Sequence, residues 1–172
     1  MLDLGVGPGA SALEAPAGEP RRAAIGLDRS AAMLRRAARA ARVAGVPLPL
    51  LRADALALPL RAGALAGATG HSVLYLLPDP AAALRELCRA LRPGGRVAFL
   101  EPRAGRPALR ATLRRGPRCA ASMLLWRGMS GLHRRFDEEG LAALLEAAGL
   151  SGARAWPVLD GFGVMAVAER PV

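Results

Sequence analysis

The sequence predicts an α/β fold built on a mostly parallel sheet. Short apolar segments with strand character alternate with longer segments in which apolar residues recur at helical spacing. Glycine and proline residues separate the two kinds of segment, as expected where short turns join strands to helices. Alternation of this kind packs helices against a parallel sheet. The 172 residues suffice for one sizeable core, so we expect residues 1–172 to form a single domain.

The first half of the chain contains three expected strands and two expected helices. The strands are expected at residues 1–4, 23–28 and 48–54. A short helix is expected over residues 10–15, before the proline-rich segment that begins at Pro16. Ser30 is placed to cap the second helix, because its hydroxyl can accept a hydrogen bond from the first turn. Gly45 and Pro47 end that helix.

The second half continues the alternation. Residues 64–77 and 96–102 read as the fourth strand with its following turn and as the fifth strand. Asp79 and Pro80 begin a helix whose core-facing stripe follows an i, i+3, i+4, i+7 pattern. That stripe consists of Leu84, Leu87, Cys88 and Leu91, and Arg92 lies at the expected helix end. Residues 137–149 form a late helix, and Asp160-Gly161 marks a terminal hairpin.

Composition excludes several classes of protein. All 24 basic residues are arginine, and they give a net charge of +10, which we attribute to compositional bias at solvated positions. Aromatic residues make up only 3%, so a nucleic-acid partner is not expected. No apolar run reaches the ~18 residues of a membrane span. Two separated cysteines suggest no disulfide framework and no metal site, and a reducing cytoplasm is expected.

The segment "LDLGVGPG" places three glycines directly after the first strand. Gly5, Gly7 and Gly9 alternate along a strand-to-helix turn, where open parallel sheets bind their ligands. Glycine lets the backbone approach a ligand closely, because it has no Cβ. The sequence therefore predicts a binding turn here, and a plain tight turn is the simpler alternative.

Two acidic residues follow the next two strands. Asp28 lies nineteen positions after Gly9 and can accept both hydroxyls of a ribose diol. Asp54 ends the third strand, near the expected position of a base. Gly5, Gly7 and Ala10 also satisfy the pattern of a dinucleotide site. That pattern leaves the acid after the third strand without a role, so we favour a nucleoside site of another kind.

Several segments resemble class I S-adenosylmethionine-dependent methyltransferases. "LDLGVGPG" is similar to their first motif, "GLDRSAAML" to their ribose-binding acid and "RADALALPL" to their adenine-contacting segment. "HSVLYLLPDPAAALRELCRALRPGGRVAFLEP" resembles a later block of the subgroup that contains quinone-biosynthesis and other small-molecule methyltransferases. The resemblance covers nearly all of the chain except residues 103–135.

The resemblance implies a three-layer Rossmann-like sandwich. The family's sheet is seven-stranded and mostly parallel, in the order 3-2-1-4-5-7-6, with the last strand antiparallel and helices on both faces. Family members usually carry helices before the first motif, which here begins at Asp3. We therefore expect the gene product to start further upstream, or this chain to be a shortened form.

The resemblance also implies S-adenosyl-L-methionine as cofactor and assigns roles to twelve residues. Asp3 and Gly5 would face its methionine portion, with Gly7 and Gly9 making room. Asp28 would bind the ribose. The adenine would contact Arg29, Met33, Asp54 and Ala55, and the methyl-donor side would be lined by Gly70, His71 and Ser72.

The expected reaction is in-line transfer of the sulfonium methyl group to a small-molecule acceptor. His71 is the candidate general base, with a wall residue as the alternative. Residues 103–135 are expected to form a helical lid over an apolar acceptor, an ordinary packed helix or a peripheral membrane contact. A catalytically impaired relic and an NAD(P)-dependent oxidoreductase remain alternative functions. The sequence leaves the acceptor, the methylated atom and the oligomeric state open.

Overall fold

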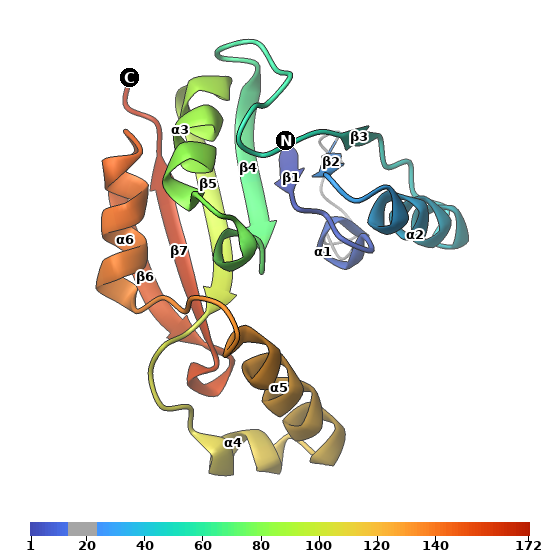
Figure 1. The fold of residues 1–172 in the computed structure, drawn as a ribbon, viewed down its shortest axis with the longest axis vertical. Helices are drawn as coiled ribbons and strands as arrows, with labels where there is room; N and C mark the ends of the chain where they lie inside the picture. Colours follow the sequence, from blue (N-terminus) through green and yellow to red (C-terminus); the bar gives the residue numbers. More distant parts are fainter. Residues whose placement is uncertain (14–23) are drawn as a thin grey trace.

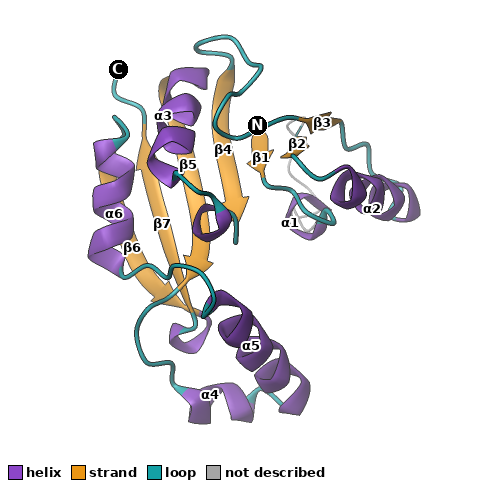
Figure 2. Ribbon diagram, in the orientation of Figure 1, coloured by secondary structure: helices purple, strands orange, loops and turns teal. Residues whose placement is uncertain are grey.

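A seven-stranded sheet forms the centre of the molecule. The computed structural model describes residues 1–13 and 24–172. The strands are β1 (Leu2–Leu4), β2 (Ile25–Asp28), β3 (Leu50–Arg52), β4 (Leu65–His71), β5 (Leu91–Pro102), β6 (Ser151–Val158) and β7 (Gly163–Glu169). Their order is β3-β2-β1-β4-β5-β7-β6, and β7 runs antiparallel to both of its neighbours (Figures 1 and 2). The predicted fold class and strand order are confirmed.

Helices cover the sheet in two groups. The helices are α1 (Ala10–Leu13), α2 (Ala31–Val43), α3 (Pro80–Ala90), α4 (Leu109–Arg114), α5 (Pro117–Ser130) and α6 (Glu138–Ala147). α2 packs on β2 and β3, whereas α3 and α6 pack on the β5–β7 side (Figure 1). Right-handed crossovers place these groups on opposite faces, because the strand order grows in opposite directions from β1 and from β4.

Leucine side chains from strands and helices form the core. Leu2 and Leu4 of β1 are fully buried, as are the inward-facing leucines of α3 and α6. The α3 and α6 leucines are Leu84, Leu87, Leu141 and Leu145. Burying a side chain of this size stabilises the fold by roughly 1.5–3 kcal/mol. The core thus holds β1 rigidly at the middle of the sheet.

The first helix pair is brought together by small residues. Ser30 caps α2, as predicted, by accepting a hydrogen bond from the Met33 backbone N–H at 3.3 Å. Ala37 and Ala41 form the buried stripe of this helix. A Cβ at Gly9 would lie 3.2 Å from the Ala37 backbone. The third glycine of the turn therefore allows α1 and α2 to approach each other.

The end of α3 differs from the sequence expectation. The helix stops at Ala90, and Leu91 and Arg92 belong to β5. The Arg170 guanidinium donates hydrogen bonds to the carbonyl oxygens of Arg89 and Leu91, near the helix end. Arg92 was expected to favour this helix end, but it is exposed. The guanidinium near this helix end therefore belongs to Arg170, close to the carboxyl terminus of the described chain, and not to Arg92.

The segment 103–135 forms α4 and α5, which lie beyond the carboxyl ends of β4 and β5 (Figure 1). Asp160 in the terminal hairpin anchors this pair of helices. Its carboxylate accepts a hydrogen bond from Thr112 at 3.1 Å and forms an ion pair with Arg115 at 3.0 Å. In the described part of the chain, no helix has both the length and the apolar character that a bilayer crossing needs.

Replacing Gly70 by alanine should destabilise the protein. A Cβ at Gly70 would lie 2.5 Å from the Phe99 ring, so side chains in the core would have to shift. We expect the free energy of unfolding to fall by about 1–3 kcal/mol in urea denaturation.

Gly128→Ala in α5 is the matched control, because a Cβ there meets nothing within 4 Å. We expect this change to raise the free energy of unfolding by about 0.5–1 kcal/mol, the gain of alanine over glycine in a helix. Equal stability of the two variants would contradict this account of the packing.

Candidate functional site

A cavity of about 650 Å³ lies at the carboxyl ends of the central parallel strands. Its walls come from the turn after β1, the ends of β2 and β3, and the loop after β4. The sheet order reverses between β1 and β4, and the crevice outside such a reversal is the usual ligand site of open α/β sheets. The volume is in the range of small-molecule and cofactor sites.

Nine of the twelve residues predicted for the site line this cavity. They are Gly5, Gly7, Asp28, Arg29, Met33, Asp54, Ala55, His71 and Ser72. The nine residues come from four separate segments of the chain. The fold therefore brings together positions that the sequence separates by up to 67 residues, the distance from Gly5 to Ser72.

The other three residues, Asp3, Gly9 and Gly70, lie outside the cavity lining. Gly9 packs on α2, and Gly70 packs beneath Phe99 and Val73. Asp3 is only 3% exposed and accepts hydrogen bonds from Ser11 at 2.7 Å and Thr69 at 3.3 Å. Burial raises the pKa of Asp3, although these hydrogen bonds oppose the shift. Asp3 therefore reaches the cavity only through Ser11, which lines it.

The glycine turn has a backbone that few other residues adopt. Gly5, Gly7 and Gly9 have φ values of 67°, 54° and 94°. A Cβ at Gly5 would also lie 2.4 Å from the side chain of Val73, which leaves no room for one. A Cβ at Gly7 would meet only the Gly5 carbonyl oxygen, at 3.8 Å, so this part of the turn stays open to the cavity.

The Asp28 carboxylate ties the glycine turn to the second strand. One oxygen accepts a hydrogen bond from the Gly7 backbone N–H at 3.0 Å, and the other accepts from the Ser30 backbone N–H at 2.8 Å. Each carboxylate oxygen has two lone pairs, so each keeps one for a ligand. The side chain is half-buried and lines the cavity. The arrangement suits a pair of neighbouring hydroxyl groups.

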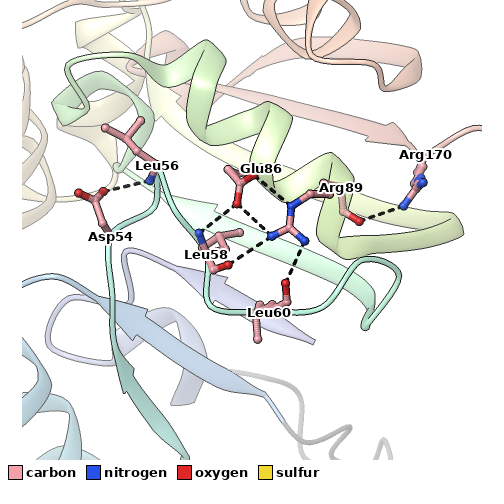
Figure 3. A network of polar contacts seen from close by, with 7 residues as sticks. All are labelled: Asp54, Leu56, Leu58, Leu60, Glu86, Arg89 and Arg170. Carbon is pink, nitrogen blue, oxygen red and sulfur yellow. Dashed lines mark hydrogen bonds and ion pairs between the residues drawn. The ribbon is translucent and has the colours of Figure 1, made fainter.

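A polar network fixes the segment that follows Asp54 (Figure 3). The Asp54 carboxylate accepts a hydrogen bond from the Leu56 backbone N–H at 3.0 Å. Glu86 of α3 accepts from the Leu58 backbone N–H at 3.1 Å, and Arg89 donates to the carbonyl oxygens of Leu58 and Leu60. The hydrogen bond from Arg89 lowers the pKa of Glu86. The exposed carboxylate of Asp54 is thereby held at the cavity edge.

The loop after β4 brings a strained residue to the cavity. Ser72 has a φ of 56°, an uncommon backbone conformation for a residue other than glycine, asparagine or aspartate. Its backbone N–H donates to the Leu100 carbonyl at 2.8 Å. Its hydroxyl oxygen is buried and has no hydrogen-bond partner among the described residues. An unpaired buried hydroxyl in a cavity wall fits a site that receives a polar ligand.

Aromatic contacts join this loop to the α5 region. The His71 and Trp126 rings meet edge to face, with centroids 6.4 Å apart, and the Tyr75 and His133 rings meet at 5.7 Å. Met129 of α5 lines the cavity itself. The side of the cavity nearest β4 is thus bounded by a histidine, a tyrosine and apolar side chains of the loop after β4, together with Met129 of α5.

Glu101, at the end of β5, was not predicted as a site residue. Its side chain is fully buried, and its carboxylate accepts hydrogen bonds from the backbone N–H groups of Val73, Leu74 and Tyr75 at 3.0, 2.9 and 3.3 Å. Burial raises the pKa of Glu101 to about 7, although the three donors favour the ionised form. Glu101 therefore holds the cavity loop from behind. The sequence signal that could have identified Glu101 is its position as an acidic residue directly after the apolar run of this strand.

A larger hollow of about 1130 Å³ lies at the opposite end of the sheet. It is lined by Met1, the middle of β4, the amino-terminal halves of β5 and β6 and the end of β7, including the exposed ion pair of Arg96 and Glu169. Parallel strands present their ligands at the carboxyl ends, so we assign the site to the smaller cavity. The described residues contain no group of three or more potential metal ligands at either end.

Comparison with known proteins gives consistent results. Residues 2–99 match the family model described as "Methyltransferase domain". Over 101 residues the chain is 40% identical to a demethylmenaquinone methyltransferase of Thermus thermophilus, covering 59% of this chain and 46% of that protein. Over 107 residues it is 39% identical to a trans-aconitate 2-methyltransferase of an Azoarcus species, covering 60% and 39%. The chain spans less than half the length of these curated relatives.

Solved structures agree on the fold. A SAM-dependent methyltransferase from Aquifex aeolicus superposes with a TM-score of 0.73 at 19% identity. The match covers 98% of this chain and 80% of that one. At this identity the likeness concerns the fold, and it includes the helices of the segment 103–135, which the sequence resemblance left out.

Replacing Glu101 by glutamine should remove one pH dependence of stability. Because burial favours the neutral carboxyl, Glu101 is ionised in the unfolded chain but still protonated in the folded one between about pH 4.5 and about pH 7. We expect this group to lower the free energy of unfolding by roughly 3 kcal/mol over that range, stability being highest at the acid end.

Urea denaturation at a series of pH values measures the difference between the native chain and Glu101→Gln. Shifted groups common to both proteins, such as Asp3 and Glu86, cancel in that difference. Glu139→Gln, at an exposed position, is the control and should leave the slope unchanged. An unchanged slope in Glu101→Gln would show that its carboxyl does not titrate in this range.

Proposed function

Because the chain belongs to the methyltransferase domain family, we propose that it transfers the methyl group of S-adenosyl-L-methionine to a small-molecule acceptor. One observation carries the proposal: Asp28, Asp54 and the open part of the glycine turn surround a single cavity at the sheet reversal. The three features follow three adjacent strands, which is the arrangement that an extended nucleoside ligand requires.

The residues present fit this cofactor. Asp28 would bind the ribose hydroxyls through the lone pairs that Gly7 and Ser30 leave free. Asp54 and Ala55 would border the adenine, with Arg29 and Met33 beside it. The methionine portion would lie along Gly5 and Gly7, where Ser11 rather than Asp3 presents a polar group to the cavity. The unpaired Ser72 hydroxyl is a further partner for a polar part of the ligand.

The bound cofactor supplies an already electrophilic sulfonium methyl group. The task left to the protein is to align the acceptor with that methyl and to exclude water. Gly5, Ser72 and Val73 form the wall where the two ligands would meet. His71 lies at this wall with its ring against Trp126, and it would take a proton from an acceptor that must lose one.

The acceptor side favours a compact and partly apolar molecule. Tyr75, Leu76, Leu77 and Met129 line it. We assign α4 and α5 the role of a lid within a single domain, since Met129 reaches the cavity from α5. The relatives named for demethylmenaquinone and trans-aconitate suggest two acceptor classes, quinols and small carboxylic acids. The apolar lining favours the quinol class.

Asp28→Ala should weaken cofactor binding. We expect the dissociation constant of S-adenosylhomocysteine to rise by about tenfold or more in calorimetry, because charge-assisted hydrogen bonds to the ribose are lost. Glu139→Ala removes an equal charge from an exposed position and should leave the constant unchanged.

The Asp28 variant also loses its bonds to Gly7 and Ser30. Thermal unfolding without ligand should therefore accompany the titration, to show that the variant is folded under the conditions used. A folded Asp28→Ala protein with the native affinity would place the ribose elsewhere.

Methyl transfer itself is tested with radiolabelled S-adenosylmethionine and separate panels of quinols, phenols, amines, carboxylic acids and lipids. We expect label to enter the quinol panel, because the acceptor side of the cavity is mainly apolar. His71→Ala should lower kcat with little change in KM if the acceptor is deprotonated. Tight binding of S-adenosylhomocysteine without transfer to any panel would instead support a catalytically impaired relic.

A further inference from the structure

The positive charge of the chain is concentrated in one segment. Residues 103–135 contain nine arginines and no aspartate or glutamate, whereas the rest of the chain has fifteen arginines and fourteen acidic residues. This segment, which forms α4 and α5 with their connections, therefore holds nine of the ten net positive charges. Compositional bias alone does not explain a charge excess confined to one pair of helices.

Most of these arginines face solvent. Within the described residues, Arg103 pairs with Glu138 and Arg115 pairs with Asp160, and none of the other seven forms an ion pair. The exposed, unpaired members of the group are Arg106, Arg110, Arg114, Arg118 and Arg134. Their charge is available to an external anionic partner.

The same segment exposes large apolar side chains. Leu124, Leu125 and Met129 of α5 are 47%, 65% and 51% exposed, and Leu132 just beyond the helix is 85% exposed. Leu125 and Met129 are four residues apart and so are neighbours on one face of the helix, and Leu124 lies beside them. Ala120 and Ser130 are buried on the opposite face. The outward face of α5 is therefore an uncovered apolar stripe within an arginine-rich segment.

We propose that α4 and α5 dock on the surface of an anionic lipid bilayer. The apolar stripe of α5 enters the boundary between headgroups and acyl chains, and the surrounding arginines contact lipid phosphates. Interfacial helices combine these two features, an apolar face and an excess of cationic residues. The charge also argues against a symmetric contact through this segment, since a second copy would bring its five exposed, unpaired arginines against the same five.

Nucleic acid fits the surface less well. Single-stranded partners need exposed aromatic rings for stacking, and the aromatic ring on α5, Trp126, is turned to His71. Solvated leucines at the centre of the patch contribute nothing to phosphate binding, whereas a bilayer buries them. The apolar component therefore selects lipid over a polyanion in water.

Docking in this orientation places the cavity next to the bilayer. Met129 belongs to the exposed stripe and also lines the cavity. An amphiphilic acceptor then passes from the lipid to the site along α5. This consequence rests on the proposed function, whereas the docking itself does not.

Vesicle flotation tests the docking directly. We expect the native chain to float with vesicles of phosphatidylcholine mixed with phosphatidylglycerol, and not with phosphatidylcholine alone. Leu124→Ser with Leu125→Ser should weaken binding about tenfold or more, since two large apolar side chains no longer enter the lipid. Val43→Ser, at an apolar position of α2 that is 84% exposed, is the matched control and should bind as the native chain does.

Two triple variants that each remove three arginines test the contribution of charge. Arg110, Arg114 and Arg118 changed together to glutamine should reduce binding to the mixed vesicles. The triple change of Arg35, Arg36 and Arg39 on α2 removes the same charge from exposed positions and should have little effect. Equal losses in the two triple variants would overturn the proposal, because binding would then follow net charge alone.

A second measurement uses the unmodified chain, so it does not depend on the folding of any variant. Hydrogen exchange should slow in residues 117–132 when mixed vesicles are added, and not in α2. Failure of the native chain to float with mixed vesicles would overturn the proposal, and so would a lack of protection in residues 117–132. RNA binding would also overturn it if the RNA displaces the vesicles and the double leucine variant binds RNA as the native chain does.

Discussion

The arrangement of the site depends on the central position of β1. This short strand is hydrogen-bonded on both sides, to β2 and to β4, and its leucines are fully buried. From β1 the sheet continues to β2 and β3 on one side, and from β4 it continues to β5 on the other. Because the crossovers are right-handed, the chain therefore leaves β1 and β4 toward opposite faces of the sheet. The two departing segments open a crevice between the glycine turn and the loop after β4. The cavity lies there as a consequence of topology.

Carboxylates then hold the irregular backbone around that crevice. Asp28 accepts from the glycine turn, and Glu101 accepts from three consecutive N–H groups of the loop after β4. Glu86 accepts from the segment after β3. Each of these segments has backbone N–H groups that find no acceptor within a strand or helix, those after β4 lying at the start of the 3-10 turn Leu74–Leu76. Side-chain acceptors satisfy these donors and keep the walls of the cavity in place.

Local signals were sufficient to predict much of this structure. The glycine turn and the helix starts act within a few residues: Ser30 makes its predicted capping bond, and Asp79 and Asp137 cap the helices that were expected to begin there. Contacts between distant segments were not predictable in the same way. Arg170 donates to carbonyl oxygens at the end of α3 from the far end of the chain, and Glu101 accepts from N–H groups 26 to 28 positions before it. The charge of α4 and α5 was visible in the sequence, but the exposed apolar side chains that favour a lipid partner are seen only in the structure.

The carboxylates and the glycine turn around the cavity suit S-adenosylmethionine rather than a nicotinamide dinucleotide. Isothermal titration of the native chain with S-adenosylhomocysteine and, separately, with NADH tests it most directly. We expect saturable binding of S-adenosylhomocysteine at one site per chain and no measurable heat of binding with NADH. Tight binding of NADH without binding of S-adenosylhomocysteine would contradict it and would support a dinucleotide-dependent oxidoreductase.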